Sequence, residues 1–494
     1  MNNTPENRFS SRRLIRNWIS LAGAIIAVGS FFAFLLLFSL DISAEHGNPY
    51  MGILAYAVAP AFLVLGIGLV ICGALLQLRQ ERKAKQGGAP VAFTIDLSRA
   101  RDRRILSVFT TCSVAFLFMT AVGSYQTYHY TESVEFCGKA CHVPMDPEFV
   151  TAQHSPHARV ECAACHVGSG ASAYVKTKIS GMRQLYHLAL NDFARPIRLN
   201  PDKLRPARET CEQCHWPQKF TGGFERTFRH FLADEKNTPF SVRLLVNVGG
   251  GDPLRGPAGG IHWHMNLANK IEYVSPDEQQ RVIPWVRHTD AKGVVTEYRN
   301  PEFKGDLTKL PIHKMDCIDC HNRPSHNFLS PNEAVDTSLA SGRMDVKIPW
   351  VKSKVVNALI QPYATQAEAL QKIDASLRAA YPNMPGVDAL VAESQSIYKA
   401  NFFPEMKADW RAYPNHLSHK EWDGCFRCHD GKHKTADDKT SIKANDCKSC
   451  HLILAQGNDE EILKLNAKGY DFVHIDAEYS DFSCAECHTG ATPK

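Results

Sequence analysis

Five residues, Cys162, Ala163, Ala164, Cys165 and His166, form a Cys-x-x-Cys-His motif. Two thiols at this spacing can each add to one vinyl group of the same porphyrin, and the histidine that follows is held against the iron as an axial ligand. The motif therefore predicts covalently attached haem c. A single Cys-x-x-Cys pair could instead belong to a zinc ribbon or a redox dithiol, so the number of copies decides the interpretation.

Five further copies of the motif follow, and a looser copy with three residues between its cysteines precedes them. Six chance copies are implausible, so we expect seven covalent haems, numbered in chain order. The predicted attachment residues are Cys137, Cys141, Cys162, Cys165, Cys211, Cys214, Cys317, Cys320, Cys425, Cys428, Cys447, Cys450, Cys484 and Cys487. The predicted proximal iron ligands are His142, His166, His215, His321, His429, His451 and His488.

The number and positions of the cysteines indicate the cellular compartment of the protein. The chain has 494 residues and 16 cysteines, and only Cys72 and Cys112 lie outside the motifs, both in apolar runs. The cysteines therefore do not describe a disulfide framework. Because bacterial haem c is attached outside the cytoplasmic membrane, we expect residues 125–494 to be periplasmic.

The formal net charge of +5 comes from the N-terminal quarter of the chain. Residues 1–124 carry 12 Lys and Arg against 6 Asp and Glu, which leaves 44 and 45 for the remainder. Haem propionates would make that remainder more acidic. Nucleic-acid binding, which needs a basic surface, is not suggested.

Three stretches are long enough to span a bilayer, which takes about 20 apolar residues: Trp18–Leu40, Met51–Leu78 and Ile105–Tyr128. The first could be a cleaved signal peptide, but its length and the two further stretches favour a membrane helix. Basic residues precede the first stretch and fill the loop between the second and third, whereas residues 41–50 contain none. By the positive-inside rule the N-terminus is cytoplasmic. We therefore predict a multi-pass protein of the bacterial inner membrane.

The fold class that we predict is a membrane-anchored multihaem cytochrome c with three N-terminal transmembrane helices and a mainly helical or irregular, haem-packed periplasmic domain with little β-structure. The predicted parts are a membrane domain at 1–124, a four-haem part at 125–330, a haem-free helical segment at 331–412 and a three-haem segment at 413–494. The four-haem part contains a haem-free insert at about 216–312. Apolar runs at Val242–Val248 and Lys270–Val274 predict a few strands there.

A haem that only transfers electrons needs a second axial ligand. The best distal candidates lie close to motifs, namely His157, His313, His326, His419, His433 and His474. His262 and His264 flank Trp263, and of these two we select His264. Ligation by two histidines gives low-spin irons of low potential, suited to transfer rather than to substrate chemistry.

Residues 105–326, without the insert, resemble the NapC/NirT family of membrane-anchored tetrahaem quinol dehydrogenases. The resemblance rests on an apolar helix, on Phe136 and Cys137 with Met145 shortly after, on the histidines before Cys162 and on Cys317–His326. It implies that the first haem lies at the membrane surface beside a quinol site, with Met145 as its ligand, although the longer first motif leaves Met145 and His142 as alternatives. It further implies that His157 or His154 serves the third haem and His326 the second.

Two extra membrane stretches and three extra haems resemble the inner-membrane cytochromes of the ImcH type, which take electrons from menaquinol in metal-respiring bacteria. The predicted function is therefore quinol dehydrogenase, passing electrons from the quinone pool along the haems to periplasmic cytochromes or reductases in anaerobic respiration. The alternatives are a relay subunit of a larger respiratory complex or homo-oligomer, and a terminal reductase. A reductase needs a haem with an open position, which the supply of histidines disfavours.

Quinol oxidation releases protons, so a base must lie near the first haem. The residues that could accept the proton are Asp146, Glu132, Glu135, Glu148 and His129, and Lys139 could orient a quinol oxygen. Any one of them could equally be a solvated surface charge.

Overall fold

The computed structural model describes residues 17–43, 58–85, 98–140, 142–167, 171–198, 205–250, 259–266, 268–443, 447–475 and 484–491. The chain divides into two compact units, one of residues 1–133 and 167–190 and the other of residues 134–166 and 191–494. Cys141 lies outside the described residues, as do the side chains of His142 and Cys447 and most of the loop at 41–50.

The first unit is helical. Its helices are α2 (Trp18–Ser43), α4 (Ala59–Lys85), α5 (Ala100–Glu132) and α9 (Ala171–Leu190). Among the described residues, two helices are long and apolar enough to cross a membrane, over Trp18–Leu35 and Ala59–Gln80. The third predicted stretch, Ile105–Tyr128, lies inside α5, a less apolar helix of 33 residues.

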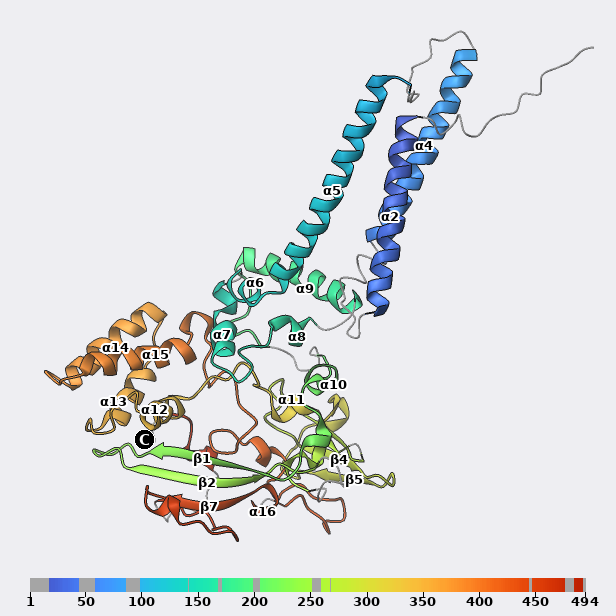
Figure 1. Ribbon diagram of the computed structural model, residues 1–494. Helices are drawn as coiled ribbons and strands as arrows, with labels where there is room; N and C mark the ends of the chain where they lie inside the picture. The colour runs from blue at the N-terminus through green and yellow to red at the C-terminus, as the bar shows by residue number, and fades with distance from the viewer. Residues whose placement is uncertain are drawn as a thin grey trace, which may run out of the picture. The chain divides into compact units, whose positions relative to one another are not determined.

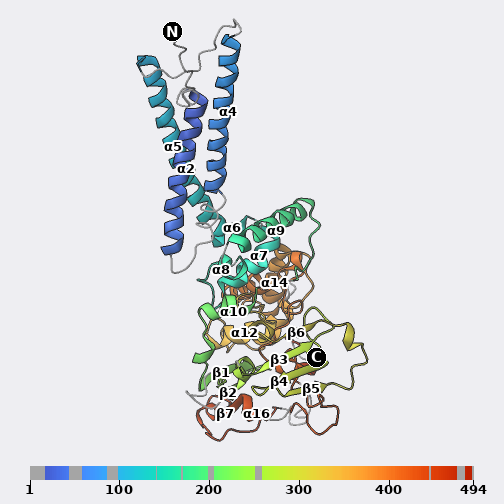
Figure 2. The ribbon, with the colours of Figure 1, turned by 90° about the vertical axis from the view of Figure 1, so that its right-hand side faces the viewer.

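Helices α2 and α4 lie side by side (Figures 1 and 2). Small residues allow the close approach: a Cβ added to Gly23 would lie 2.5 Å from the carbonyl oxygen of Gly66, and one added to Gly66 would lie 2.6 Å from the backbone nitrogen of Ala27. The Ser20 hydroxyl also donates to the Val70 carbonyl at 3.2 Å. Small residues and hydroxyl bonds at the contact are typical of helices that pack in a bilayer, where apolar burial gives no driving force.

The second unit contains two antiparallel sheets. One has the order β1-β2-β7, from Gly223–Phe231, Pro239–Asn247 and His451–Gly457. The other has the order β5-β4-β3-β6, from Val295–Arg299, Trp285–Thr289, Lys270–Val274 and Ile312–Lys314. Strands form where the two apolar runs predicted them, but the insert holds five whole strands, β1 to β5, and β6 begins at its end, so the second unit has more β-structure than the little that we expected.

A conventional hydrophobic core lies in the segment between motifs four and five. It is built by α12 (Pro331–Ala340), α13 (Val351–Leu359), α14 (Gln366–Ala380) and α15 (Val387–Asn401), and α12 contacts β1 (Figure 1). In α14, Ala369, Ile373 and Leu377 repeat at a spacing of four and are fully buried. The Thr365 hydroxyl caps this helix by accepting from the Glu368 amide at 3.2 Å.

Candidate haem sites

Each motif described in full forms a short helical turn. The turns of motifs two to seven are α8 (Cys162–His166), η3 (Cys211–Gln213), α11 (Cys317–Cys320), η8 (Gly424–Arg427), α16 (Cys447–Cys450) and α17 (Cys484–Cys487). In motifs three, four, five and seven the backbone N–H of the histidine donates to the carbonyl of the first cysteine at 2.8 to 3.0 Å. This bond closes one turn and brings the imidazole next to both thiols.

Six motif histidines each face a second histidine from elsewhere in the chain. The pairs, with the distance between ring centroids, are His166 and His326 (6.2 Å), His215 and His157 (6.0 Å), His321 and His262 (6.3 Å), His429 and His264 (5.9 Å), His451 and His419 (6.2 Å), and His488 and His474 (6.1 Å). The six distances are nearly equal although the interplanar angles range from 4° to 90°.

A spacing near 6 Å suits two imidazoles that share one metal ion. A metal–imidazole bond is about 2 Å long and the nitrogen lies roughly 1 Å from the ring centre, so two rings on opposite sides of one ion have centres about 6 Å apart. Edge-to-face aromatic rings also reach this distance, as Phe328 and Phe403 do at 6.1 Å, so the recurrence of the spacing at six motif histidines is what points to shared metal ions. The pairs therefore have the geometry of two axial ligands.

Backbone carbonyls orient four of the distal rings. The Nδ1 atoms of His157, His326, His262 and His264 lie 2.9 to 3.1 Å from the carbonyl oxygens of Pro324, Glu148, Val248 and Ile261, respectively. An Nδ1–H that donates to a carbonyl leaves Nε2 as the lone-pair atom for a metal. The rings are thus held in the tautomer that an axial ligand requires.

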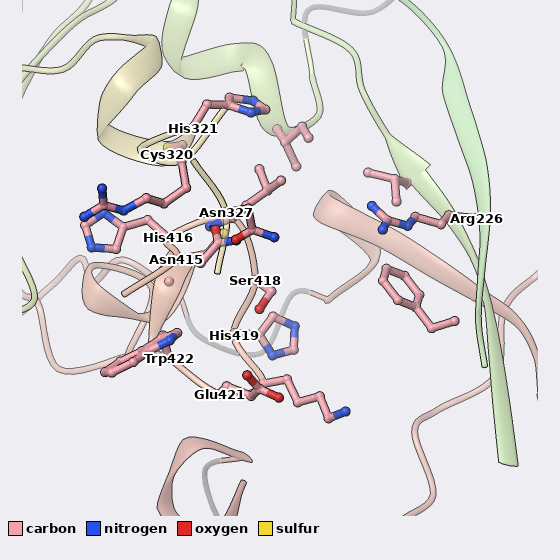
Figure 3. Close-up of a pocket in the computed structure, with 18 of the residues that line it drawn as sticks. Arg226, Cys320, His321, Asn327, Asn415, His416, Ser418, His419, Glu421 and Trp422 are labelled. Carbon is pink, nitrogen blue, oxygen red and sulfur yellow. The ribbon is translucent and has the colours of Figure 1, made fainter. Parts of the chain in front are cut away.

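One cavity of about 3000 Å³ runs through the second unit. Ordinary ligand pockets have volumes of about 300 to 1,000 Å³, so this cavity has room for several large groups. It is lined by residues of motifs three to seven and by five of the distal histidines. Figure 3 shows part of it, with Cys320 and His321 of motif four near His416 and His419.

Consecutive motifs lie beside one another. The thiols of Cys137 and Cys162 are within hydrogen-bond distance, and this bond lowers the pKa of Cys162 to about 7. Burial is the main cause of the raised pKa of Cys317, and the nearby Cys211 thiol adds to it. In the same way Cys425 adds to burial in raising the pKa of Cys320 to about 11. These neighbouring thiols place motif one beside motif two, motif three beside motif four, and motif four beside motif five.

The polar atoms of the cavity also fit haem c. Among the described residues, Arg205 Nη1 and Arg323 Nε are buried without a hydrogen-bond partner, and both side chains line the cavity. Such donors match the two propionates of a porphyrin. Thiols, paired imidazoles and buried donors together form the set that covalent haem needs, and haem bound there supplies one-electron redox chemistry.

Of the seven distal histidines that we predicted, five face a motif histidine, whereas His313 and His433 contact other residues. His433 is fully buried, and its Nδ1 and Nε2 lie 2.8 Å from Asp430 Oδ1 and 2.7 Å from the Ile283 carbonyl, so both ring nitrogens have partners. His313 on β6 stacks on Tyr273 with ring centroids 5.4 Å apart. His262, which we weighed beside His264 and did not select, faces His321, and its signal in the sequence was its place beside Trp263.

Motif one is described only in part. Cys137 lies on α6 (Val134–Lys139), and Met145 is half-buried on α7 (His142–Gln153). Phe149 packs on Gly138, where a Cβ would lie 2.0 Å from the ring, and Lys139 lies over the same ring at 5.7 Å. The choice between Met145 and His142 lies outside the described side chains.

The residues predicted for the quinol site fall in both units. His129, exposed, and Glu132, buried, lie on α5 in the first unit, whereas Glu135, Lys139, Asp146 and Glu148 belong to the second. Asp146 is exposed. The Glu148 carboxylate lies 3.4 Å from His326 Nδ1, and burial raises its pKa against the opposing effect of Arg323. Glu148 is thus tied to the distal ligand facing motif two.

Comparison with known proteins identifies the family of the chain. Residues 99–210 match the N-terminal region of the NapC/NirT cytochrome c family. The chain is 38% identical to "Cytochrome c-type protein ImcH" of Geobacter sulfurreducens, over 96% of this chain and 95% of the relative. No solved structure matches the chain significantly. The chain therefore belongs to the ImcH-like cytochromes of the NapC/NirT family, membrane-anchored multihaem c-type cytochromes that act in electron transfer.

Proposed function

We propose that the protein is a seven-haem quinol dehydrogenase of the inner membrane. In this proposal it oxidises a membrane quinol, expected to be menaquinol, at the periplasmic face and passes the electrons along its haems to periplasmic cytochromes or reductases. The observation that carries the proposal is the set of six histidine pairs, five of which line one continuous cavity. Two axial imidazoles at each site favour electron transfer over binding of a reducible substrate.

The entry point of the electrons is proposed from the chain itself. In the proposal α5 is the third membrane span and the N-terminus is cytoplasmic. Cys137 lies nine positions after Tyr128, at the end of the predicted span. Nine extended residues reach at most about 30 Å, so haem one is held near the membrane surface. A quinol's head group stays in the same region while its tail remains in lipid.

The proton acceptor that we propose is Asp146, next to Met145 and exposed on α7. Asp146→Asn should slow reduction of the purified protein by a menaquinol analogue while leaving reduction by dithionite unchanged. Asp438→Asn is the matched control, because Asp438 is 78% exposed and lies on a turn of the C-terminal segment. A wild-type quinol rate in the Asp146 variant would move the base to Glu132, Glu135, Glu148 or His129.

The haem count and the activity are tested separately. Intact mass of the mature protein should correspond to seven haems, and a mass for six would remove motif one. Quinol oxidation by the isolated protein supports a dehydrogenase. If seven haems are present and only a partner complex can reduce them, the protein is a relay subunit instead.

A further inference from the structure

The segment η5 (Ile261–Met265) carries two distal histidines, and they face different motifs. His262 faces His321 of motif four, and His264 faces His429 of motif five. Residues two apart have Cα atoms separated by at most about 7.6 Å. Motif four ends the part that resembles the tetrahaem family, and motif five begins the C-terminal extension.

We propose that His262-Trp263-His264 is a ligand bridge that fixes haem four and haem five as one coupled pair, and so forms the junction between the four-haem part and the C-terminal three-haem part. The inference rests on haem binding as proposed above and not on quinol oxidation. His321 with His262 and His429 with His264 would hold the two haems, which would supply one-electron transfer from a ferrous to a ferric iron with no proton moved.

The bridge is anchored on both sheets. The backbone N–H of His262 donates to the Val248 carbonyl, one residue after β2, at 3.1 Å. Trp263 packs against the small core of the other sheet, which contains Ile271, Tyr273, Ile283 and Val286. Its carbonyl accepts from Asn269 Nδ2 at 3.0 Å. A segment held from both sides can keep two imidazoles at fixed positions.

A turn that contains Gly250 packs closely against the backbone of the bridge. Gly250 has φ +87°, and a Cβ there would lie 2.2 Å from both the backbone carbon of His262 and the backbone nitrogen of Trp263. The contact is backbone to backbone, so a side chain could be accommodated only if the backbone of η5 or of the Gly250 turn moved. Gly250 is therefore required for the position of both ligands at once.

The two motifs are also joined on their proximal side. Arg427, between the cysteines of motif five, donates from one Nη to the carbonyl of Asp319 in motif four, at 2.7 Å. Its other Nη donates to the Gln280 carbonyl at 2.7 Å, and Tyr273 donates to Asp319 Oδ1 at 2.6 Å. The distal bridge and this proximal link hold the same two motifs, so neither can shift without the other.

Methionine variants test the ligand assignment on the holoprotein. His262→Met and His264→Met should each convert one low-spin haem from bis-histidine to histidine/methionine ligation, with a raised potential and an unchanged haem mass. The double variant should convert two haems. Optical and electron-paramagnetic spectra and a redox titration with chemical mediators read this out without quinol. Only one altered haem in the double variant would overturn the bridge.

A glycine variant tests whether the two ligands move together. Gly250→Ala should perturb the spectra of two haems at once and reduce the exciton coupling in Soret circular dichroism. Gly293→Ala is the matched control, because Gly293 also has a positive φ, +81°, but open space around its Cβ position. Perturbation of one haem, or of none, in Gly250→Ala would overturn the coupled pair. If this variant fails to fold, the methionine double variant still tests whether His262 and His264 ligate two different haems.

These outcomes are distinct from failure of the proposed function. Loss of quinol oxidation with intact spectra would refute the dehydrogenase and leave the bridge standing. Intact quinol oxidation with a single altered haem in the methionine double variant would refute the bridge and leave the dehydrogenase standing.

Discussion

Lys352 and Asp336 form an ion pair inside the haem-free helical segment, and its loss should destabilise that segment. Lys352 Nζ lies 2.7 Å from Asp336 Oδ1, and the side chains are 8% and 4% exposed. Lys352 also donates to the Phe231 carbonyl at the end of β1. The pair therefore ties α12 and α13 to the sheet.

The expected magnitude follows from what Lys352→Met leaves behind. Asp336 would keep two weaker partners, the Phe231 amide at 3.2 Å and His230 Nδ1 at 3.1 Å. Removing one member of a buried pair typically costs about 3–5 kcal/mol because the other charge stays buried. Since two partners remain, we expect the lower end, about 3 kcal/mol. Burial already lowers the pKa of Lys352, partly opposed by Asp336.

Hydrogen exchange of α12 and α13 peptides in the intact, detergent-solubilised protein measures this loss as a lower opening free energy. Lys372→Met is the matched control, because the pair between Lys372 and Glu368 has the same 2.7 Å distance but lies in solvent. The control should leave exchange unchanged. Equal exchange in both variants would refute the argument that burial makes the Lys352 pair important. The double variant Lys352→Met with Asp336→Leu should recover part of the loss, since no unpaired carboxylate remains.

Two further predictions concern histidines. His326→Ala should turn one low-spin haem high-spin without loss of covalent haem, whereas His433→Ala should leave all haems low-spin, because both nitrogens of His433 are already bonded; optical spectra of the purified variants check this. Burial, assisted by the charge of Arg427, lowers the pKa of His416 to about 3. Between pH 6.5 and about 3 the unfolded chain binds a proton at His416 that the folded protein does not, so stability falls as pH falls through this window. His416→Asn should flatten that dependence in denaturation experiments at pH 7 and pH 5, and an unchanged slope would assign the acid sensitivity to other groups.

The sequence predicted those parts of the site that depend on local spacing. A Cys-x-x-Cys-His motif needs one helical turn, and the turns form at the motifs that the structure describes. The helical segment predicted at 331–412 likewise contains α13 and α14, because an apolar face repeating every three to four residues has to be buried.

The distal ligands could be predicted only in part, because tertiary structure decides which histidine faces which motif. His326 follows motif four in sequence but faces His166 of motif two, as the family resemblance and not the spacing predicted, and His419 precedes motif five but faces His451 of motif six. Closeness to a motif also suggested His433, whose ring nitrogens are taken up by Asp430 and Ile283. Spacing along the chain carries no information on such bonds.

The role of the haem-free insert could likewise not be predicted from spacing along the chain, and the structure shows what the insert contributes. The insert contains no haem motif, so the sequence predicted only a few strands there. In the structure it supplies His262 and His264, and its strand β2 pairs with β7, which begins at His451 of motif six. The C-terminal segment is therefore built onto the insert through both its ligands and its sheet. Motif seven is held by the helical segment, since Trp410 Nε1 donates to the Thr489 carbonyl at 3.0 Å. A chain ending at residue 412 would lose β7 and His419 and leave His264 without its facing histidine. The three added motifs thus extend the same folded unit, so the electron path that we propose would not require a separate domain to dock after haem four.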